Sequence, residues 1–454
     1  MNDAHEAAIR PGKTASRPLT FDRRAKTAIA AALIAAFGAG PAEAANTFFV
    51  NTAGDPGPMG TTSLRQAVAA ANAGDTIKFE AALTGSTITL AGGEIGISKE
   101  LVIMGPGSGQ LTISGNDASR VFNVDFGDSS KKFKLYDMSL VHGKASAGCG
   151  GAVVVTDSYV YLSNIRISQS SALSGGGICV QNGAAQVSRT AVFNNSATTG
   201  GGISFTGPNA DFIEISLSTI SGNEASDRGG GIYAAGGVPL SPELILSRST
   251  VSGNRVMGSG GGGGMFLAIL GSAGSEIYDC TIAENYAHSG GGGVVTAYAT
   301  TSHNLYIANS TIVSNTTLND ADGNGLRAVG AQLGKLKSSI VANNSSASGA
   351  VDLSGSFNAS FNLVRNAGTA VITGANNLFG ADPLLGTLAN RGGSTKTMIP
   401  AADSPVIGSG SSVCLPSASK DQRVFERCVG APDIGAVERQ GVEDFVFRDS
   451  FDLP

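Results

Sequence analysis

The sequence has no tryptophan, only 14% charged residues and only five cysteines among its 454 residues. Basic residues form no cluster, and this absence argues against nucleic acid and anionic lipid as partners. Beyond the first 44 residues, no stretch approaches the ~18 apolar residues that a membrane span requires. The central part of the chain also lacks apolar residues at the three-and-four spacing of helices. These absences leave a β-rich protein without a membrane span.

Glycine is abundant instead, with 64 residues, and much of it belongs to a repeat. Seven times between Ile165 and Leu353 the chain has a β-branched dyad, then a small polar step that usually ends in Asn. A run of glycines and a hydrophobic residue commonly follow. The repeated asparagines are separated by 28, 31, 31, 30 and 28 residues, and they are Asn195, Asn223, Asn254, Asn285, Asn315 and Asn343. Such regularity is typical of a solenoid, in which each repeat is one coil.

The coils are expected to consist of strands. Apolar residues come in short alternating runs rich in Val, Ile, Leu and Phe, as in Glu243–Ser247 and Leu305–Ile312. Strands stacked at roughly 4.8 Å per coil would give seven coils a length of ~34 Å. We therefore predict an all-β fold, a single right-handed parallel β-helix, with the hand following the usual crossover chirality.

The repeated glycine and asparagine are assigned to structure rather than to ligand binding. Both residue types suit the left-handed corners that a coil needs. Equivalent asparagines on successive coils can also form amide ladders. Glycine-rich matches to nucleotide-binding motifs carry no weight, because no strand–glycine–helix unit surrounds them.

The N-terminal 44 residues have the pattern of an export signal. Arg23, Arg24 and Lys26 precede the apolar stretch Thr27–Phe37, and Ala42-Glu43-Ala44 provides a cleavage site. Cleavage would leave 24 basic and 31 acidic residues, a net charge of −7. We expect an exported protein, extracellular or on the outer cell surface. The predicted parts are a signal peptide (1–44), an N-terminal cap with the first coils (45–114), the repeat rod (115–375), a C-terminal cap region (376–440) and a tail (441–454).

Secretion would permit disulfides. Cys414 and Cys428 are expected to pair, closing a 15-residue segment at the end of the rod. Cys149 and Cys179 differ in register relative to their glycines, and we expect them to be small core residues. The state of Cys280 stays open.

Both ends of a β-helix need a cap, because exposed strand edges associate. Ser63–Ala73 is the one convincing short helix, and it is followed by a strand at Thr76–Phe79. Three further strand-like segments open the first coils, at Ser86–Leu90, Leu101–Met104 and Gln110–Ser114.

The sequence around this helix carries a family resemblance. Thr62–Ala67 (TSLRQA) resembles the Cys-Ser-Leu-Arg-Glu-Ala box of bacterial secreted β-helix proteins, with Thr62 and Gln66 as departures. Near the other end, segments such as Asn377–Gly386 and Asp433–Glu438 resemble the choice-of-anchor Q region. That family's pattern includes two cysteines around Asp-Gln-Arg, here Cys414, Asp421-Gln422-Arg423 and Cys428.

Two weaker resemblances point the same way. Phe445–Leu453 resembles a short tail of secreted gamma-proteobacterial proteins, and the repeats are similar to those of polymorphic outer-membrane proteins. Together the resemblances imply a secreted or surface-attached β-helix protein. They imply no reaction, since fold does not fix function.

One candidate binding patch emerges from the repeat register. The residue after the repeated asparagine is Glu224, Arg255 and Tyr286 in three successive coils, and His288 follows two residues later. Two interpretations remain open. The patch is an exposed ion pair and cation–π contact between coils, or it is a carbohydrate-binding patch with Tyr286 as a stacking platform.

A second candidate is a calcium loop. Asp320, Asp322 and Asn324, followed by Gly325, match the first half of a D-x-D-x-N-G loop, but Ala331 stands where the twelfth-position carboxylate is expected. A solvated polar turn explains the same residues. His142 and His303 have no metal-ligand partners at useful spacing, and no Ser/His/Asp set with a nucleophile elbow is present.

We therefore expect an adhesin-like protein that presents a rigid face to extracellular polysaccharide or to another cell surface, without catalysis. No cofactor is required, although calcium is conceivable, and the protein is expected to be monomeric. The alternative is a polysaccharide lyase or a glycoside hydrolase, because pectate-lyase-like β-helix proteins cleave acidic polysaccharides. Clustered acidic and basic residues on one sheet would favour that alternative.

Overall fold

The computed structural model describes residues 45–207, 212–236, 243–269, 274–297, 305–319, 322–330, 333–412, 419–427 and 430–439. The described residues from Asn46 onward belong to one compact unit. The predicted export signal, the predicted C-terminal tail, Asp320, His303, Cys414 and Cys428 lie outside the described residues.

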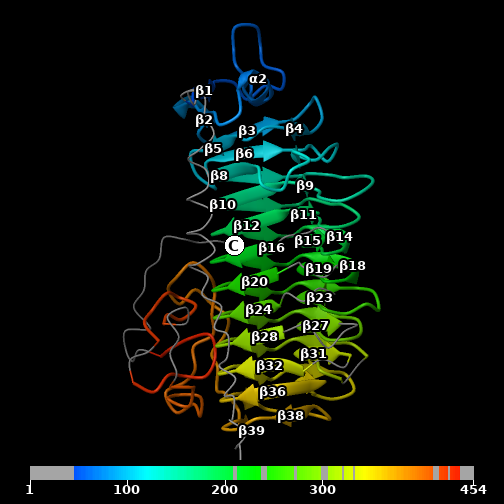
Figure 1. The fold of residues 1–454 in the computed structure, drawn as a ribbon, viewed down its shortest axis with the longest axis vertical. Helices are drawn as coiled ribbons and strands as arrows, with labels where there is room; N and C mark the ends of the chain where they lie inside the picture. The colour runs from blue at the N-terminus through cyan, green and yellow to red at the C-terminus, as the bar shows by residue number, and fades with distance from the viewer. Residues whose placement is uncertain are drawn as a thin grey trace, which may run out of the picture. The chain divides into compact units, whose positions relative to one another are not determined.

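Within the described residues, the strands form three parallel sheets (Figure 1), and the largest, sheet A, has 23 strands in two columns. Column A1 comprises β1 (Thr47–Val50), β2 (Thr76–Phe79), β5 (Val102–Met104), β8 (Lys132–Val141), β10 (Tyr159–Ser168), β12 (Ala184–Ser188), β16 (Phe212–Ser216), β20 (Glu243–Ser247), β24 (Ser275–Tyr278), β28 (Leu305–Ala308), β32 (Leu333–Lys337), β36 (Ser356–Ser360) and β38 (Val371–Thr373). Column A2 comprises β3 (Ser86–Thr89), β6 (Leu111–Ser114), the second halves of β8 and β10, β13 (Ala191–Phe193), β17 (Thr219–Ser221), β21 (Thr250–Ser252), β25 (Thr281–Ala283), β29 (Thr311–Val313), β33 (Ile340–Ala342), β37 (Leu363–Val364) and β39 (Leu378–Phe379).

The other two sheets complete each coil, with ten strands in sheet B and six in sheet C among the described residues. Sheet B comprises β4 (Ile95–Ile97), β7 (Phe122–Asp125), β9 (Val153–Thr156), β11 (Ile178–Gln181), β15 (Ile203–Thr206), β19 (Ile232–Gly236), β23 (Met265–Ile269), β27 (Val294–Ala297), β31 (Leu326–Val329) and β35 (Leu353–Ser354). Sheet C comprises β14 (Ser196–Thr199), β18 (Glu224–Arg228), β22 (Arg255–Val256), β26 (Tyr286–Ala287), β30 (Thr316–Thr317) and β34 (Ser345–Ser346). A typical coil runs from A1 through A2 and C to B, and each strand pairs in parallel with its equivalent one coil away. The predicted all-β, right-handed parallel β-helix is confirmed.

Two left-handed turns shape the coils. The first joins A1 to A2, where φ is 45° at Arg248 and 54° at Asp279. The second joins A2 to sheet C, where φ is 60° at Glu284 and 56° at Ser314. We predicted that the repeated asparagines would occupy left-handed corners. Asn343 does so, with a φ of 59°, but the prediction was wrong for Asn195, Asn223, Asn254, Asn285 and Asn315. The left-handed residue is the one before each, because the asparagine itself turns its amide inward.

A buried amide ladder runs along the second turn. Each Nδ2 donates to the Oδ1 of the next coil over 2.9–3.0 Å, and that Oδ1 also accepts a backbone N–H. Asp352 ends the ladder by accepting from Asn344 over 2.8 Å. The predicted register was one residue off at the last rung, because Asn344 is the ladder residue and Asn343 is the left-handed one. The predicted ladder is confirmed over Asn195, Asn223, Asn254, Asn285, Asn315 and Asn344.

A second ladder of small polar residues follows the first turn. Ser218 Oγ accepts from the backbone N–H of Thr190, Ser249 Oγ accepts from that of Ser218, and Ser310 Oγ accepts from that of Cys280. Cys280 takes the position of one serine, is fully buried, and its Sγ lies 3.2 Å from the carbonyl oxygen of Tyr278. Cys280 is therefore a free thiol that fills a serine position.

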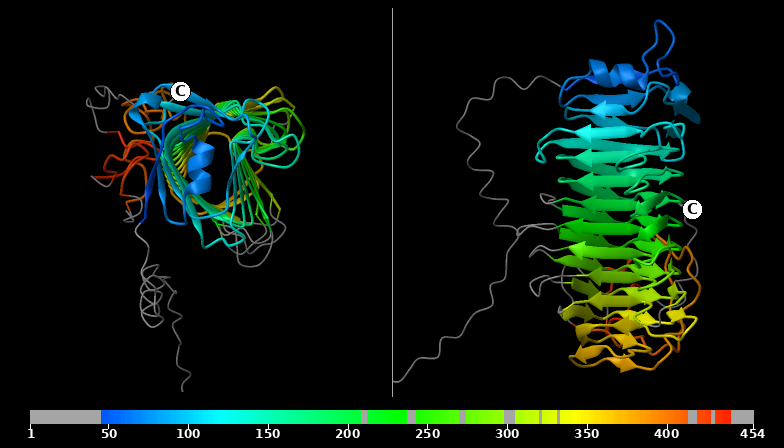
Figure 2. Two further views of the ribbon diagram at one scale, coloured as in Figure 1. Left: turned by 90° about the horizontal axis from the view of Figure 1, so that it is seen from above. Right: turned by 90° about the vertical axis from the view of Figure 1, so that its right-hand side faces the viewer.

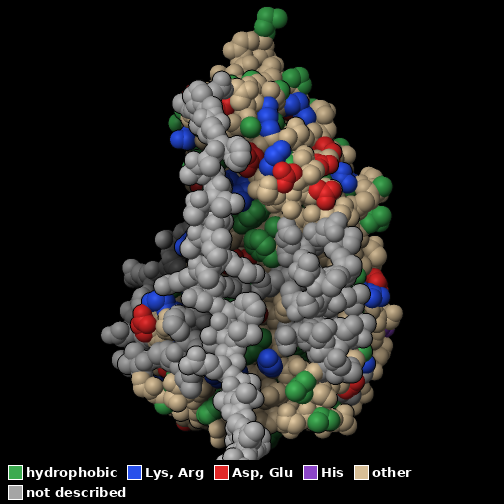
Figure 3. All heavy atoms as spheres, viewed as in Figure 1, with side chains coloured by type: hydrophobic (Ala, Val, Ile, Leu, Met, Phe, Trp, Pro, Cys, Tyr) green, Lys and Arg blue, Asp and Glu red, His purple; other side chains and the backbone are tan. Residues whose placement is uncertain are grey.

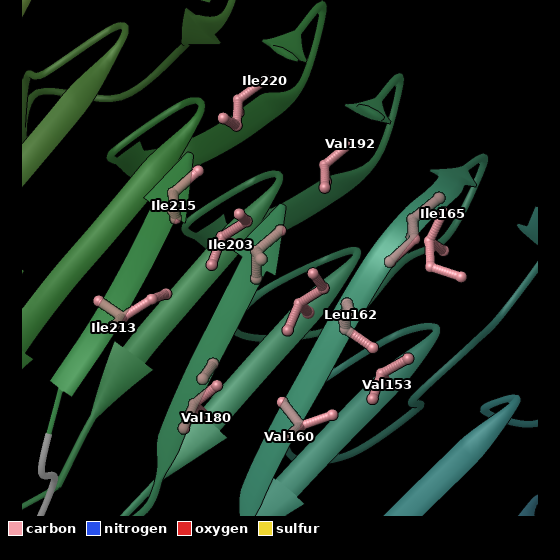
Figure 4. Packing of buried hydrophobic residues seen from close by; sticks show 14 of the residues in the cluster. Val153, Val160, Leu162, Ile165, Val180, Val192, Ile203, Ile213, Ile215 and Ile220 are labelled. Carbon is pink, nitrogen blue, oxygen red and sulfur yellow. The ribbon is translucent and has the colours of Figure 1, made fainter. Parts of the chain in front are cut away.

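The core is a continuous aliphatic column inside the coils. Inward residues of sheets A and B, such as Ile213, Ile203 and Ile220, are fully buried and point toward one another (Figure 4). The inward residues of sheet C, Ala225, Val256 and Ala287, form a small cluster of their own. Glycine is required where the coil passes from sheet C to sheet B. A Cβ at Gly230 would lie 2.3 Å from the carbonyl oxygen of Gly263 in the next coil. The glycine column therefore permits the close approach of successive coils.

The N-terminal helix α2 (Leu64–Ala70) lies across the opening of the first coil (Figure 2). A 3-10 helix (Ala81–Leu83) follows later in the chain. Ser63 and Gln66 form a reciprocal capping box, and Leu64 is 1% exposed. Arg65 pairs with Asp55 at 2.8 Å and donates to the carbonyl oxygen of Glu94. The Ser-Leu-Arg-Gln-Ala segment therefore fastens the helix onto the rod.

The C-terminal segment, described at residues 380–412, 419–427 and 430–439, lies along the flank of column A2 (Figure 2). Outward residues of A2 such as Thr281, Val313 and Ala342 are buried there, beside Met398 and Val406 of the segment. We predicted a cap at the end of the rod, and the described part of this segment contacts the rod as far back as Arg248, through Thr395. The predicted Cys414–Cys428 staple lies outside the described residues and stays a prediction.

Charged side chains are buried in this contact. Arg423 and Asp421 pair at 2.9 Å with both side chains fully buried. Arg427 lies 3.4 Å from Asp279 and 3.8 Å from Glu438. Burial raises the pKa of Asp279 to about 7 despite the opposing effect of Arg427, and burial also raises the pKa of Glu438 to about 7. The contact therefore couples the docking of this segment to protonation.

A disulfide joins Cys149 and Cys179, whose Cα atoms are 5.7 Å apart. Our prediction that both are single core residues was wrong. The two cysteines are indeed not equivalent in register, since Cys179 lies in β11 while Cys149 lies in the turn before β9. That turn folds over the outer face of sheet B, and this brings the two side chains together.

Candidate carbohydrate-binding faces

Sheet C carries the patch predicted from the repeat. Glu224 of β18 pairs in register with Arg255 of β22, and Arg255 pairs with Tyr286 of β26. The guanidinium carbon of Arg255 lies 5.1 Å from the centroid of the Tyr286 ring. One face of that ring is therefore occupied by a cation from the neighbouring coil. Glu224 and Arg255 are both exposed.

His288 lies on the same side of the coil as Tyr286, because Ala287 between them points inward and is fully buried. Its Nε2 is 3.2 Å from the Nδ2 of Asn319 in the next coil. The structure thus brings Glu224, Arg255, Tyr286 and His288 to one surface, as the register predicted. Whether this surface binds a ligand stays a prediction.

The predicted calcium loop is described only in part. Asp322 lies 3.7 Å from Arg327. Asn324 is fully buried, its Nδ2 donates to Thr317 Oγ1 over 2.7 Å, and its Oδ1 accepts the N–H of Val351. Since Asp320 is not among the described residues, calcium binding stays a prediction. No group of three or more His, Cys, Asp or Glu that could hold a metal was found in the described ranges.

A larger polar and aromatic surface lies on the outer face of column A1, and the sequence analysis did not identify it. Strand pairing aligns one residue per coil along the rod. We call this surface the tyrosine face, and its central row is Lys134, Tyr161, Gln186, Glu214, Ile245, Glu276, Tyr306, Lys335 and Asn358. On the side drawn in Figure 3, basic and acidic side chains gather over the N-terminal coils, with hydrophobic side chains below them.

Aromatic contacts between coils fix the N-terminal part of the tyrosine face. The rings of Tyr136 and Tyr161 are 5.5 Å apart, as are those of Tyr159 and Phe212. Lys132 Nζ lies 4.9 Å from the centre of the Tyr159 ring. Each of these pairs joins neighbouring strands or strands two coils apart, so the rings are held in place by the rod itself.

Polar groups continue this surface. The Tyr159 hydroxyl donates to Gln186, whose Nε2 donates to Glu214 over 2.9 Å. Burial raises the pKa of Tyr159 to about 12, with a smaller contribution from Glu214, and burial also raises the pKa of Tyr306. These phenols stay protonated at physiological pH and present a hydroxyl beside a half-buried ring.

A pocket of about 380 Å³ opens at the C-terminal end of the tyrosine face. It is lined by Tyr306, Lys335, Lys337, Asn358 and Ser360 of the sheet, and by Ser411 of the C-terminal segment. Its walls thus come from two parts of the chain that are far apart in sequence.

The sequence held a signal for the tyrosine face that we did not use. Each of five central-row residues stands three residues before a left-handed residue, and these five are Tyr161, Gln186, Glu214, Glu276 and Tyr306. Counting from the Asn repeat aligned only the short sheet C. A count of nine residues back from each ladder asparagine would also have aligned the central row, from Gln186 before Asn195 to Tyr306 before Asn315.

A comparison with solved structures finds the crystal structure of pectate lyase Pel9A, with a TM-score of 0.49 and 14% sequence identity, over 87% of this chain and 96% of that chain. No family model and no curated protein sequence matches the chain. Among the described residues, no helix is long and apolar enough to cross a membrane.

Proposed function

We propose that this protein is an exported, adhesin-like β-helix that binds an extracellular or cell-surface polysaccharide along its tyrosine face, without cleaving it. The observation that carries the proposal is the row of aromatic and polar residues from Tyr161 to Tyr306. Five coil spacings separate these two residues, which corresponds to ~24 Å along the rod. A linear polymer lying along the rod would meet a repeated set of rings and hydrogen-bonding groups.

Tyrosine suits such a surface because its ring is apolar and its hydroxyl is polar. The rings of Tyr136, Tyr159 and Tyr161 already lie against neighbours, so little conformational entropy is lost on binding. The rod holds the spacing of the groups constant. Rigidity of this kind favours binding to a stiff, repetitive ligand.

Export is supported by the sequence of the first 44 residues and by the Cys149–Cys179 disulfide. Structural disulfides persist in oxidising compartments and are rare in the cytosol of mesophiles. The resemblance to secreted, surface-attached β-helix proteins agrees with this location. Attachment to the cell surface is part of the proposal.

Cleavage is the second candidate, and one observation favours it. Glu214 and Glu276 occupy the same row with Ile245 between them, so two coil spacings, ~9.6 Å, separate their backbones. Inverting hydrolysis of a glycosidic bond needs carboxyl groups ~6.5–9.5 Å apart, and backbones ~9.6 Å apart lie just beyond the upper end of that range, so the side chains would need to lean toward each other. The Glu214→Gln and Glu276→Gln variants are the matched tests of this candidate.

The experiment that separates binding from cleavage uses the purified protein and a panel of acidic and neutral polysaccharides, with calcium and with chelator. New reducing ends report hydrolysis, and absorbance of unsaturated products reports lyase activity. We expect retention of the protein on at least one polymer and no product. Product that disappears in Glu214→Gln or Glu276→Gln would overturn the non-catalytic proposal.

A further inference from the structure

The pocket at the end of the tyrosine face differs in charge from the rest of the protein. The full chain has a net charge of −5, yet the residues that line the pocket include two lysines and no acid. In the described part of the chain, no ion pair involves Lys335 or Lys337. A concave site of one charge sign raises the local concentration of the opposite ion.

The two lysines are held on the same side of one strand. Lys335 and Lys337 flank Leu336, which points inward and is 1% exposed. Because alternate residues of a strand share a face, both side chains leave the sheet in the same direction, from backbone positions ~6.6 Å apart. Lys335 is exposed and Lys337 half-buried. Two ammonium groups that leave the same strand in the same direction can contact the two oxygens of one carboxylate.

The neighbouring coils add groups that recognise a sugar ring. Tyr306 pairs in register with Lys335 on one side, and Asn358 pairs with it on the other. Ser360 pairs with Lys337. An amide and a hydroxyl can bond to sugar hydroxyls, while the half-buried Tyr306 offers ring surface. A volume of about 380 Å³ is within the ~300–1,000 Å³ of small-molecule pockets.

Of the two acidic residues in the same row, Glu276 is the nearer to Lys335 and lies two coils away, on the far side of Tyr306. A polymer bound along the face would therefore meet an acidic side chain near Glu276, where an uncharged sugar fits, and two lysines at the pocket, where a charged sugar fits. The C-terminal end of the tyrosine face is therefore the end that suits an anionic ligand.

We propose that the Lys335–Lys337 pocket binds a uronate residue of an acidic polysaccharide, with the two ammonium groups on its carboxylate and Asn358 and Ser360 on its hydroxyls. This inference rests on the proposed function and adds its ligand class. It fixes the orientation of the polymer, whose uronate lies at the C-terminal end of the rod.

The test is calorimetric titration with a galacturonate tetramer and with its fully methyl-esterified counterpart, which has the same sugars and no charge. We expect the acid to bind at least tenfold more tightly than the ester. Lys335→Ala and Lys337→Ala should each weaken binding of the acid about tenfold, because a hydrogen bond to a charged group is lost, and should leave the ester unchanged.

The matched control is Lys144→Ala, an exposed lysine between β8 and β9 that lies outside column A1 and outside the pocket. It should bind the acid as the unchanged protein does. Lys335→Glu tests the same site by charge reversal and should abolish the preference for the acid. Circular dichroism of each variant checks that the rod is intact.

The possible results of this titration distinguish failure of the proposed uronate pocket from failure of the proposed polysaccharide binding. Equal binding of acid and ester, unchanged by the lysine variants, overturns the pocket and leaves the polysaccharide-binding proposal standing. Lysine-dependent binding of galacturonate monomer without binding of any polymer overturns the function and supports the pocket. Inorganic sulfate competing as strongly as galacturonate would show a general anion site and contradict the role given to Asn358 and Ser360. No binding of any probe overturns both.

Discussion

The Thr281 hydroxyl donates a hydrogen bond of 2.6 Å to Oε1 of Gln422, a residue 141 positions later in the chain. The other end of the same amide donates to Thr250 and to Thr395, each over 2.9 Å. All four side chains are at most 5% exposed. Gln422 therefore joins two coils of the rod to the C-terminal segment, and the Asp-Gln-Arg motif acts in docking.

Replacing Gln422 with alanine should loosen this docking. Buried polar groups without partners cost ~1–3 kcal/mol each, so we expect Gln422→Ala to lose about 2–3 kcal/mol of unfolding free energy. Urea denaturation measures this loss, and limited proteolysis should show earlier cleavage of the C-terminal segment. Thr89→Ala, an exposed position of the same column, is the control. A Gln422→Ala protein with wild-type stability would contradict the docking role.

The amide ladder predicts a large effect from one internal substitution. Asn254→Ala removes the acceptor of the Asn223 N–H and the donor to the Ile220 carbonyl oxygen, both buried. We expect a loss of at least about 3 kcal/mol in unfolding free energy, measured by chemical denaturation. Asn72→Ala, at an exposed residue outside the ladder, should change stability little. Equal stability of the two variants would show that the ladder contributes nothing.

The Cys149–Cys179 disulfide should stabilise the N-terminal coils. The bridge closes a loop between residues 30 positions apart, for which chain entropy gives roughly 3–4 kcal/mol. The Cys149→Ser, Cys179→Ser double variant should melt at a lower temperature in calorimetry. Cys280→Ser is the matched control, since serine occupies the equivalent position in neighbouring coils. A double variant that melts like the unchanged protein would exclude this stabilising role.

The buried carboxyls at the C-terminal contact predict a pH dependence. The pKa values of Asp279 and Glu438 are raised to about 7 in the folded protein, from ordinary values of 3.8 and 4.5. Between about pH 4 and 7 the folded state therefore binds more protons than the unfolded state. The contribution of these two groups to stability falls as the pH rises through that window and is constant above it.

Asp279→Asn tests this dependence, because the amide cannot ionise. Melting temperatures measured from pH 5 to pH 8 should decline less with rising pH in Asp279→Asn than in the unchanged protein. Glu224→Gln, at an exposed carboxyl far from the contact, should keep the original slope. Parallel curves for all three proteins would show that Asp279 is ionised throughout.

The fold could be predicted from the sequence because the repeat imposes it. The strands at Thr76–Phe79 and Glu243–Ser247 have the predicted bounds, and the helix near Ser63 begins where its capping residues place it. Asn343 and Asn344 show the limit of such counting. By sequence, either of these adjacent asparagines could be the ladder residue, and only the inward direction of its amide selects Asn344.

Contacts between distant segments could not be predicted in the same way. Cys149 meets Cys179 because a turn folds over sheet B, and no repeat position encodes that path. Gln422 meets Thr281 because the chain returns along its own flank. The tyrosine face differs from these two contacts, because its central row from Gln186 to Tyr306 stands nine residues before the ladder asparagines and was within reach of a count along the sequence.

Affinity for polysaccharide in single tyrosine variants tests the central claim most directly. Tyr161→Ala and Tyr306→Ala should each weaken binding of the retained polymer by about tenfold, the effect of losing one anchoring aromatic side chain. Tyr286→Ala lies in β26 of sheet C, outside the tyrosine face, and should bind as the unchanged protein does. Loss of binding in Tyr286→Ala with full binding in Tyr161→Ala and Tyr306→Ala would place the site on sheet C and contradict the proposed tyrosine face.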